Sequence, residues 1–122
     1  MQALVHRAAR EEIDALAGPE RQAMEHAITK LEALGQQMGF PHSSAVKGAD
    51  RLRELRPRAG RSPWRGFYRR VGDAMVVAAV GPEAKVDPQR FTAAVRTAED
   101  RLTTLEQERA RRANQAEGGK QP

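Results

Sequence analysis

The chain has 122 residues, with 21 Lys and Arg against 16 Asp and Glu and a formal net charge of +5. This length suits one domain with a single core, and the lack of cysteine excludes both a disulfide scaffold and a thiolate zinc site. No apolar run approaches the roughly 20 residues that a membrane span needs. Acids follow Met1 too closely for a signal peptide, so we expect a cytoplasmic protein without a membrane partner.

The N-terminal third of the sequence predicts a strand and two helices. Gln2 to His6 is a short apolar run that is compatible with a strand. Apolar residues then recur at helical spacing in two segments, separated by a break at Ala17 to Pro19. They are Ala9, Ile13 and Leu16 in the first segment, and Met24, Ile28, Leu31 and Leu34 in the second. Two amphipathic helices joined by a short break indicate a helical hairpin.

The middle of the chain changes to the alternating pattern of strands. Phe40 to Asp50 is expected to be a loop, followed by strands at Leu52–Arg58, Pro63–Val71 and Ala74–Val80. Gly72-Asp73, between the last two strands, is typical of a two-residue hairpin turn with glycine first. The strand Ala74–Val80 is apolar on both faces, so we expect it to be central and a candidate partner for the N-terminal strand.

The last third predicts one helix and a tail. Asp87 is a helix N-cap and is followed by proline at the first helical position. A helical stripe follows, made of Phe91, Val95, Ala98, Leu102 and Leu105. The charges beyond Leu105 indicate a helix that runs past the globule, and we expect Ala113–Pro122 to be disordered. The predicted fold is α+β, in the order β-α-α-β-β-β-α, with a small, mostly antiparallel sheet in one domain of residues 1–112.

Positive charge is concentrated in the predicted hairpin. Arg51 to Arg70 contains eight arginines and one acid, Glu54, so the segment carries +7 and the remainder of the chain sums to −2. One explanation is a solvated sheet face in a protein from a genome that favours arginine codons. A second is nucleic-acid binding, with phosphates neutralised by arginine and bases stacked on Trp64 or Tyr68. A third is RNA cleavage without a metal ion.

Metal-free RNA cleavage needs a group that activates the ribose 2′-hydroxyl, cations for the phosphorane and an acid for the leaving oxygen. Arginines on adjacent strands supply the cations. For proton transfer the sequence offers Glu54, Tyr68, His42 and Lys47, whereas His26 on a helix is expected to be solvated. No metal-ligand spacing, phosphate-binding glycine loop or nucleophile elbow is present in the sequence. We therefore expect no metal ion or other cofactor.

Four segments together resemble the HigB-like, phage-derived branch of the RelE/ParE toxin superfamily. They are "AREEIDAL", "LEALGQQMGFPHSSAVKGADRLRELR", "WRGFYRRVGDAMVVAAV" and "DPQRFTAAVRTAEDRL". The resemblance covers residues 4 to 105, and its most specific parts are Glu54-Leu55-Arg56 and the group formed by Trp64, Arg65 and Tyr68. It implies a small sheet flanked by helices, in agreement with the pattern above.

The resemblance also implies the toxin of a type II toxin-antitoxin system. Such a toxin enters the ribosomal A site, cleaves mRNA and is neutralised by a small antitoxin, commonly with a helix-turn-helix domain. Carried over, Arg65 would contact the scissile phosphate, Arg56 would lie at the basic end of the preceding strand, and Lys47 would lie just before that strand. We expect Glu54 or His42 to transfer protons, and the residues expected to bind RNA are Lys47, Arg53, Arg58, Arg61, Trp64, Tyr68, Arg69 and Lys85. Tyr68 matches a family aromatic for which core packing is the favoured role.

The chain also departs from the family pattern. Pro82 and Glu83 occupy positions that are usually basic, and no Tyr or His follows Tyr68. Two alternatives therefore stay open. One is a ParE-like toxin that blocks a DNA gyrase-type enzyme without catalysis, and the other is a degenerate toxin that binds only its antitoxin or RNA.

Overall fold

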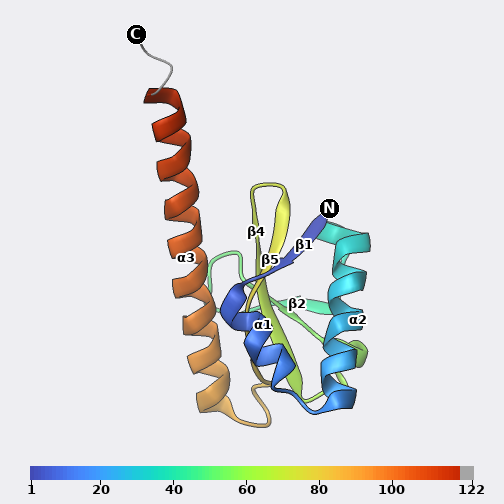
Figure 1. The fold of residues 1–122 in the computed structure, drawn as a ribbon. Coiled ribbons are helices and arrows are strands. Elements are labelled where there is room, and N and C mark those ends of the chain that lie inside the picture. The colour runs from blue at the N-terminus through green and yellow to red at the C-terminus, as the bar shows by residue number, and fades with distance from the viewer. Residues whose placement is uncertain (119–122) are drawn as a thin grey trace.

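The chain forms a sheet with helices on both faces (Figure 1). The computed structural model describes residues 1–118. The elements in chain order are β1 (Gln2–Val5), α1 (Arg7–Asp14), α2 (Gly18–Leu34), the 3-10 turn η1 (Gly35–Gln37), β2 (Ser43–Ala45), β3 (Arg53–Leu55), the 3-10 turn η2 (Pro57–Gly60), β4 (Trp64–Val71), β5 (Ala74–Pro82) and α3 (Pro88–Gly118). Within this described part, no helix combines the length and the apolar character needed to cross a membrane.

The strands form one mixed sheet in the order β1-β5-β4-β3-β2. β1 and β5 are parallel, and the other neighbouring pairs are antiparallel. The α+β class, the interior place of β5 and its pairing with the N-terminal strand are therefore confirmed. The β4–β5 turn has Gly72 at a φ of +60°, a conformation that favours glycine. This agrees with the predicted glycine-first turn.

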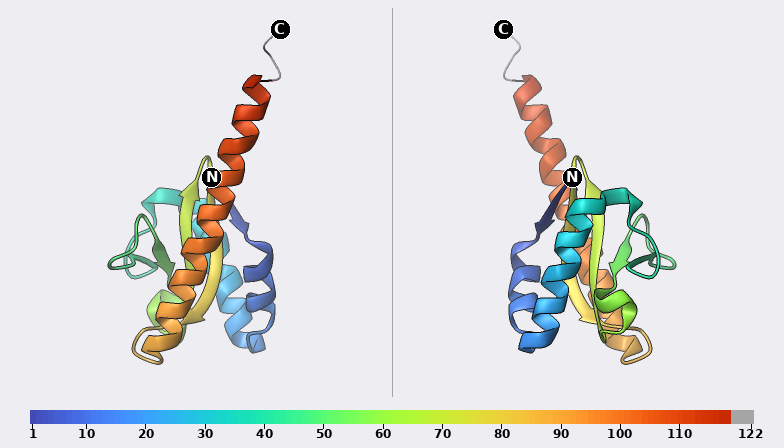
Figure 2. Two further views of the ribbon diagram at one scale, coloured as in Figure 1. Left: turned by 90° about the vertical axis from the view of Figure 1, so that its left-hand side faces the viewer. Right: turned by 90° about the vertical axis from the view of Figure 1, so that its right-hand side faces the viewer.

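Two buried clusters, one on each face of the sheet, hold the helices in place. Figure 2 shows the ribbon from two further sides. α1 and α2 pack on one face through side chains that include Ile13, Met24 and Leu31. α3 packs on the other face through Ala94, Ala98 and Leu102. The successive residues Phe67 and Tyr68 belong to opposite clusters, and the register between β4 and β5 is irregular at this point.

α3 approaches β5 so closely that one position admits only glycine. A Cβ atom at Gly81 would lie 2.5 Å from the Cβ of Ala94, which is shorter than any ordinary van der Waals contact. The helix can therefore lie directly on the strand at this point. Its C-terminal part then extends beyond the sheet (Figure 1).

Boundaries of several elements differ from the sequence predictions, and three differences are larger than the extension of β5 to Pro82. Ser43–Ala45, inside the segment expected to be a loop, forms β2 and pairs with β3. The strand expected at Leu52–Arg58 is limited to Arg53–Leu55, because Pro57 has no N–H for the ladder and begins η2. α3 continues to Gly118, past the expected disordered start at Ala113, since its Ala, Arg, Gln and Glu residues favour helix. The rest of the expected tail, 119–122, lies outside the described residues.

Candidate functional site

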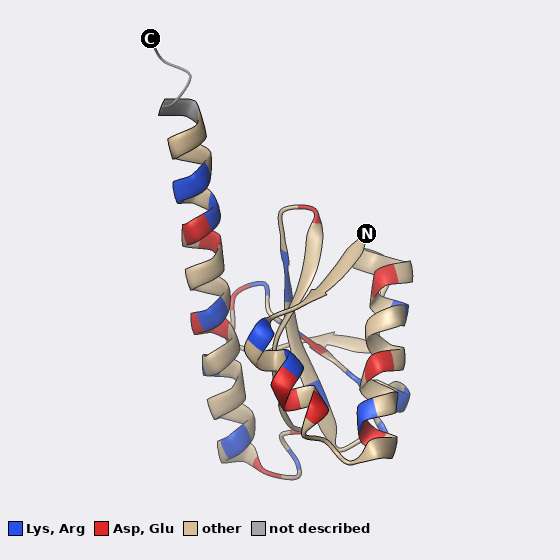
Figure 3. Ribbon diagram, viewed as in Figure 1, with Lys and Arg blue, Asp and Glu red and all other residues tan. Residues whose placement is uncertain are grey.

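Much of the positive charge of the Arg51–Arg70 segment is neutralised in the folded chain. Figure 3 shows basic and acidic positions interleaved over the helices and loops. The ion pairs of the segment are Arg51 with Asp50 and Glu106, Arg56 with Glu54, Arg58 with Glu20, Arg65 with Glu54 and Glu83, and Arg69 with Glu106. Among the described residues, Arg53, Arg61 and Arg70 have no carboxylate partner. The free cations of the segment are therefore these three.

Arg65 lies inside the protein. Its side chain is 2 % exposed, and its guanidinium donates to the carbonyl oxygens of Ser62 (2.6 Å), Trp64 (2.9 Å) and Gly60 (3.2 Å). It also donates to Glu83 Oε2 at 2.6 Å, and its Nε lies 3.6 Å from Glu54 Oε1. A guanidinium so placed cannot contact a phosphate at the surface. The expected contact between Arg65 and the scissile phosphate is therefore corrected to a structural role.

Burial and charge act on Arg65 in opposite directions. Loss of solvent lowers the pKa of the guanidinium, and the positive charge of Arg56 lowers it further. The carboxylates of Glu83 and Glu54 raise it, and the net result is a lowered pKa. Glu54 is itself occupied, because it also accepts from Ser44 Oγ at 3.2 Å and from Arg56 Nη1 at 2.8 Å. In this arrangement Glu54 holds two arginines and is not a free proton-transfer group.

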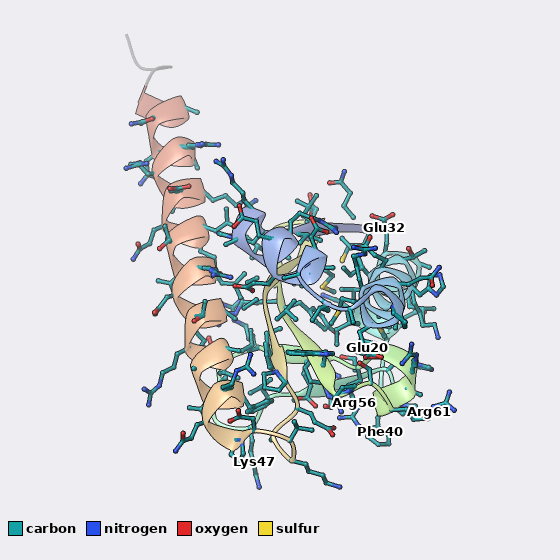
Figure 4. The ribbon with its side chains drawn as sticks, turned by 60° about the horizontal axis from the view of Figure 1, so that its bottom comes forward. Glu20, Glu32, Phe40, Lys47, Arg56 and Arg61 are labelled. Atoms are coloured by element: carbon teal, nitrogen blue, oxygen red, sulfur yellow. The ribbon has the colours of Figure 1, made fainter. Side chains whose placement is uncertain are left out.

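Arg56 links this cluster to the surface. Its side chain is 20 % exposed, and its Nε donates to the carbonyl oxygen of Pro41 at 3.0 Å. Its guanidinium carbon lies 5.2 Å from the centre of the Phe40 ring, which is 77 % exposed. Phe40, Arg56 and Arg61 gather at one end of the molecule, whereas Lys47 lies apart from them (Figure 4). An exposed aromatic ring beside an arginine is an arrangement on which a nucleic-acid base can stack.

A cavity of about 460 Å³ opens beside Arg56, between α2 and η2. We name it the α2–η2 cavity. Its ionisable lining residues are His26, Lys30, His42, Arg56, Arg58 and Arg61, and no Asp or Glu is among the lining residues in the described chain. His42 and Arg56, both expected to be catalytic residues, line this cavity together. The fold also adds Arg58 and Arg61, which were expected only as RNA-binding residues.

Two members of the cavity were missed by the sequence analysis. His26 and Lys30 are four residues apart on α2, so they project from the same side of the helix. With Gln22 they form a polar row, of which only His26 was considered in the sequence and was expected to be solvated. The spacing was visible in the sequence, but nothing in it indicated that η2 would face this row. Within residues 1–118, no three His, Asp or Glu side chains are grouped to hold a metal ion.

The other expected RNA-binding residues are scattered. Tyr68 is 2 % exposed and shares a hydrogen bond of 2.5 Å with Ser43 Oγ, so its ring packs in the core and cannot stack on a base. Arg69 is buried and donates to Glu106 and to the carbonyl oxygen of Asp50, both at 2.8 Å. Neither side chain is available to RNA in this arrangement, and core packing is the role that the resemblance favoured for Tyr68. Lys47 and Lys85 are exposed. The guanidinium carbon of Arg90 lies over the Trp64 ring, 6.0 Å from the centre of that ring.

Comparison with known proteins assigns the chain to a protein family. Residues 11–103 match the family "Phage derived protein Gp49-like (DUF891)". The comparison with curated proteins finds no match. Among solved structures, a mutant of the E. coli toxin RelE in the free state is similar, with a TM-score of 0.54 and 15 % sequence identity, over 79 % of this chain and 97 % of that one. The fold is that of RelE, and the resemblance to the RelE/ParE superfamily is confirmed.

Proposed function

This chain belongs to the Gp49-like family of phage-derived proteins, and from that premise we propose that it is the toxin of a type II toxin-antitoxin system. We propose further that it cleaves mRNA on the ribosome. The observation that carries the proposal is the α2–η2 cavity, which combines two histidines with Arg56 and the unpaired Arg61 beside an exposed Phe40. The similar fold of a protein named as the toxin RelE supports it.

The cavity contains the groups that metal-free RNA cleavage requires. Histidine is the residue type best suited to exchange protons near neutral pH. In the proposed reaction His42 takes the proton of the ribose 2′-hydroxyl, and the 2′-oxygen attacks the adjacent phosphorus. The bond to the 5′-oxygen breaks, and His26 gives that oxygen a proton. The products are a 2′,3′-cyclic phosphate and a 5′-hydroxyl end.

Arg56 and Arg61 would stabilise the negative charge of the phosphorane in this reaction. Phe40 would stack on a base next to the scissile bond. Because the ribosome holds and orients its mRNA, the toxin itself needs few groups to position the substrate. The expected partners are therefore mRNA, the ribosome and a cognate antitoxin with a helix-turn-helix domain. A protein with these partners acts in the cytoplasm.

The test is cleavage of a defined mRNA on programmed ribosomes, followed by sequencing of the ends. We expect His42→Ala to lower the rate by about 10²- to 10⁴-fold, which is the usual contribution of a general acid or base. Arg61→Ala should lower it by tenfold or more through loss of a charged contact. Arg96→Ala on α3 is the matched control, since this arginine is exposed and outside the cavity. Wild-type rates in both cavity variants would refute the proposed site.

A second candidate is a toxin or toxin relative that does not cleave RNA. It is favoured by one observation, the neutralisation of Arg65 by Glu54 and Glu83. Induction of the protein in cells separates the candidates. Translation arrest with cut mRNA supports the nuclease, and DNA damage with intact mRNA supports a ParE-like inhibitor of DNA gyrase. Absence of any growth effect supports a degenerate toxin that only binds its antitoxin or RNA.

A further inference from the structure

A second cavity lies between the η1 segment and strands β3 and β4, and we propose that it binds a nucleoside phosphate. We name it the η1–β4 cavity. Its volume is about 720 Å³. Four arginines line it, Arg51, Arg53, Arg69 and Arg70, and among the described residues no acid does. The inference does not depend on RNA cleavage at the α2–η2 cavity.

Two of these arginines are held in a geometry that suits a phosphate. Arg53 donates through Nε to Ser43 Oγ at 2.9 Å, and Arg70 donates through Nε to the carbonyl oxygen of Gly72 at 2.9 Å. In both cases the Nε bond fixes the plane of the guanidinium and leaves the two terminal nitrogens without a hydrogen-bond partner in the described chain. A guanidinium presented in this way can make paired hydrogen bonds to phosphate oxygens.

The sheet places these two charges on the same face. Arg53 is paired with Tyr68 in the register of β3 and β4, and Arg70 lies two residues beyond Tyr68 on β4. Because side chains alternate along a strand, Arg53 and Arg70 are diagonal neighbours. Like charges in this relation repel each other. A bound dianion between them would remove that repulsion, which is a reason for affinity beyond the individual contacts.

The other two arginines add little to the net charge of the cavity. Arg51 is paired with Asp50 and Glu106, and Arg69 is buried against Glu106. Two acids thus offset two arginines, and the uncompensated charge of about +2 comes from Arg53 and Arg70. This value matches a phosphate monoester, which carries −1.5 to −2 at neutral pH.

The remaining walls favour a nucleoside over a bare phosphate. The almost fully buried Met38, Met75 and Tyr68 are part of the apolar lining, and the exposed Gln36 and Gln37 provide side-chain amides. Apolar walls with a few polar groups are typical of a site that holds a ring system in one orientation. Amides can donate to and accept from the edge of a base. The cavity is large enough for a base, a sugar and a phosphate together.

The ligand could be a free nucleotide or a nucleotide within RNA. Met38 lines both the η1–β4 cavity and the α2–η2 cavity, so the two are adjacent. One RNA strand could therefore occupy both cavities, with one nucleotide held away from the bond that is cut. The shared chemistry is a ribose, a base and a phosphate.

The experiment is a calorimetric titration of the full chain with each of five probes, at two salt concentrations. The probes are AMP, GMP, adenosine, inorganic phosphate and a four-nucleotide single-stranded RNA. We expect a nucleotide or the RNA to bind at least tenfold more tightly than phosphate or adenosine, and binding should weaken as salt rises. RNA binding without mononucleotide binding would identify RNA as the source of the ligand. Equal affinity for phosphate and nucleotides, or no binding at millimolar concentration, would overturn the proposal.

Variants of the lining arginines test whether the nucleotide binds in the η1–β4 cavity. Arg70→Gln should weaken binding about tenfold or more, and it should fold normally because Arg70 is exposed. Arg53→Lys keeps the charge but loses the fixed fork, so it should also weaken binding. Arg96→Gln removes an exposed arginine of α3 that lines neither cavity, and it serves as the control with mononucleotides. Unchanged affinity in both Arg70→Gln and Arg53→Lys would refute the site. His42→Ala should leave mononucleotide binding intact while it lowers the rate of cleavage.

Discussion

Replacement of Arg65 by alanine should destabilise the fold, although the residue stands where the RelE resemblance implies a phosphate contact. The change removes a guanidinium that joins the start of β4, the carbonyl oxygens of Ser62 and Gly60, and the carboxylate of Glu83. Three carbonyl oxygens lose a charged donor, and Glu83 and Glu54 lose a buried counter-charge. We expect the free energy lost with these contacts to exceed the free energy gained because no cation has to be buried.

The magnitude follows from how far the partners can rehydrate. Removal of one member of a fully buried ion pair costs about 3 to 5 kcal/mol. Here Glu54 and Glu83 are 13 % and 26 % exposed, so water can partly replace the lost guanidinium. We therefore expect Arg65→Ala to lower the free energy of unfolding by about 2 to 4 kcal/mol. For a chain of this length the melting temperature should fall by roughly 6 to 20 °C.

Urea denaturation followed by circular dichroism measures this change, with Arg61→Ala as the control. The Arg61 guanidinium is exposed and makes one hydrogen bond, Nε to the carbonyl oxygen of Arg58 at 3.1 Å. Its removal should change the unfolding free energy by no more than about 0.5 kcal/mol. If Arg65→Ala kept wild-type stability while cleavage was lost, the assignment of Arg65 to a structural role would be wrong. A loss of activity in Arg65→Ala is informative only once its folded fraction is known.

Three further changes test the packing of α3. Gly81→Ala should lower the free energy of unfolding by about 1 to 3 kcal/mol, because the new methyl group would overlap Ala94; urea denaturation measures this, and wild-type stability would show that α3 can shift freely. Leu102→Ala should cost about 2 to 5 kcal/mol, since Leu102 is 0 % exposed and the substitution leaves a cavity. Removal of residues 110–122 should change the free energy of unfolding little, because residues 110–116 are exposed. A decrease of more than about 1 kcal/mol in urea denaturation would indicate an unrecognised contact.

The secondary structure could be predicted because it depends on patterns that are local in the sequence. The spacing of Met24, Ile28 and Leu31 predicted α2, and all three are buried against the sheet. β5 is apolar on both faces, and this local pattern predicted a strand in the interior of the sheet. The end of β3 was predicted too late, because a positive φ at Arg58 and Ala59 turns the chain immediately after Pro57. Residues other than glycine seldom adopt that conformation, so the composition gave no sign of it.

The candidate site was predicted less well because its charges are neutralised by acids that are distant in the sequence. Glu20, Glu83 and Glu106 lie on α2, after β5 and on α3, and each pairs with an arginine of the hairpin segment. A count of charges along the chain therefore overstates the field that an RNA would meet. Only the three-dimensional pairing separates arginines that hold the fold together from those that remain available to a ligand.

Under the proposed function, this separation places the charge available to RNA away from Arg65. Glu54 and Glu83 convert Arg65 into part of the core and leave no uncompensated charge around it. The free cations of the segment, Arg53, Arg61 and Arg70, line cavities on the α2 side of the sheet instead. Since both cavities contain Met38, the available charge follows one continuous surface past the end of α2. An RNA strand would meet favourable potential along this surface and little at the buried arginine.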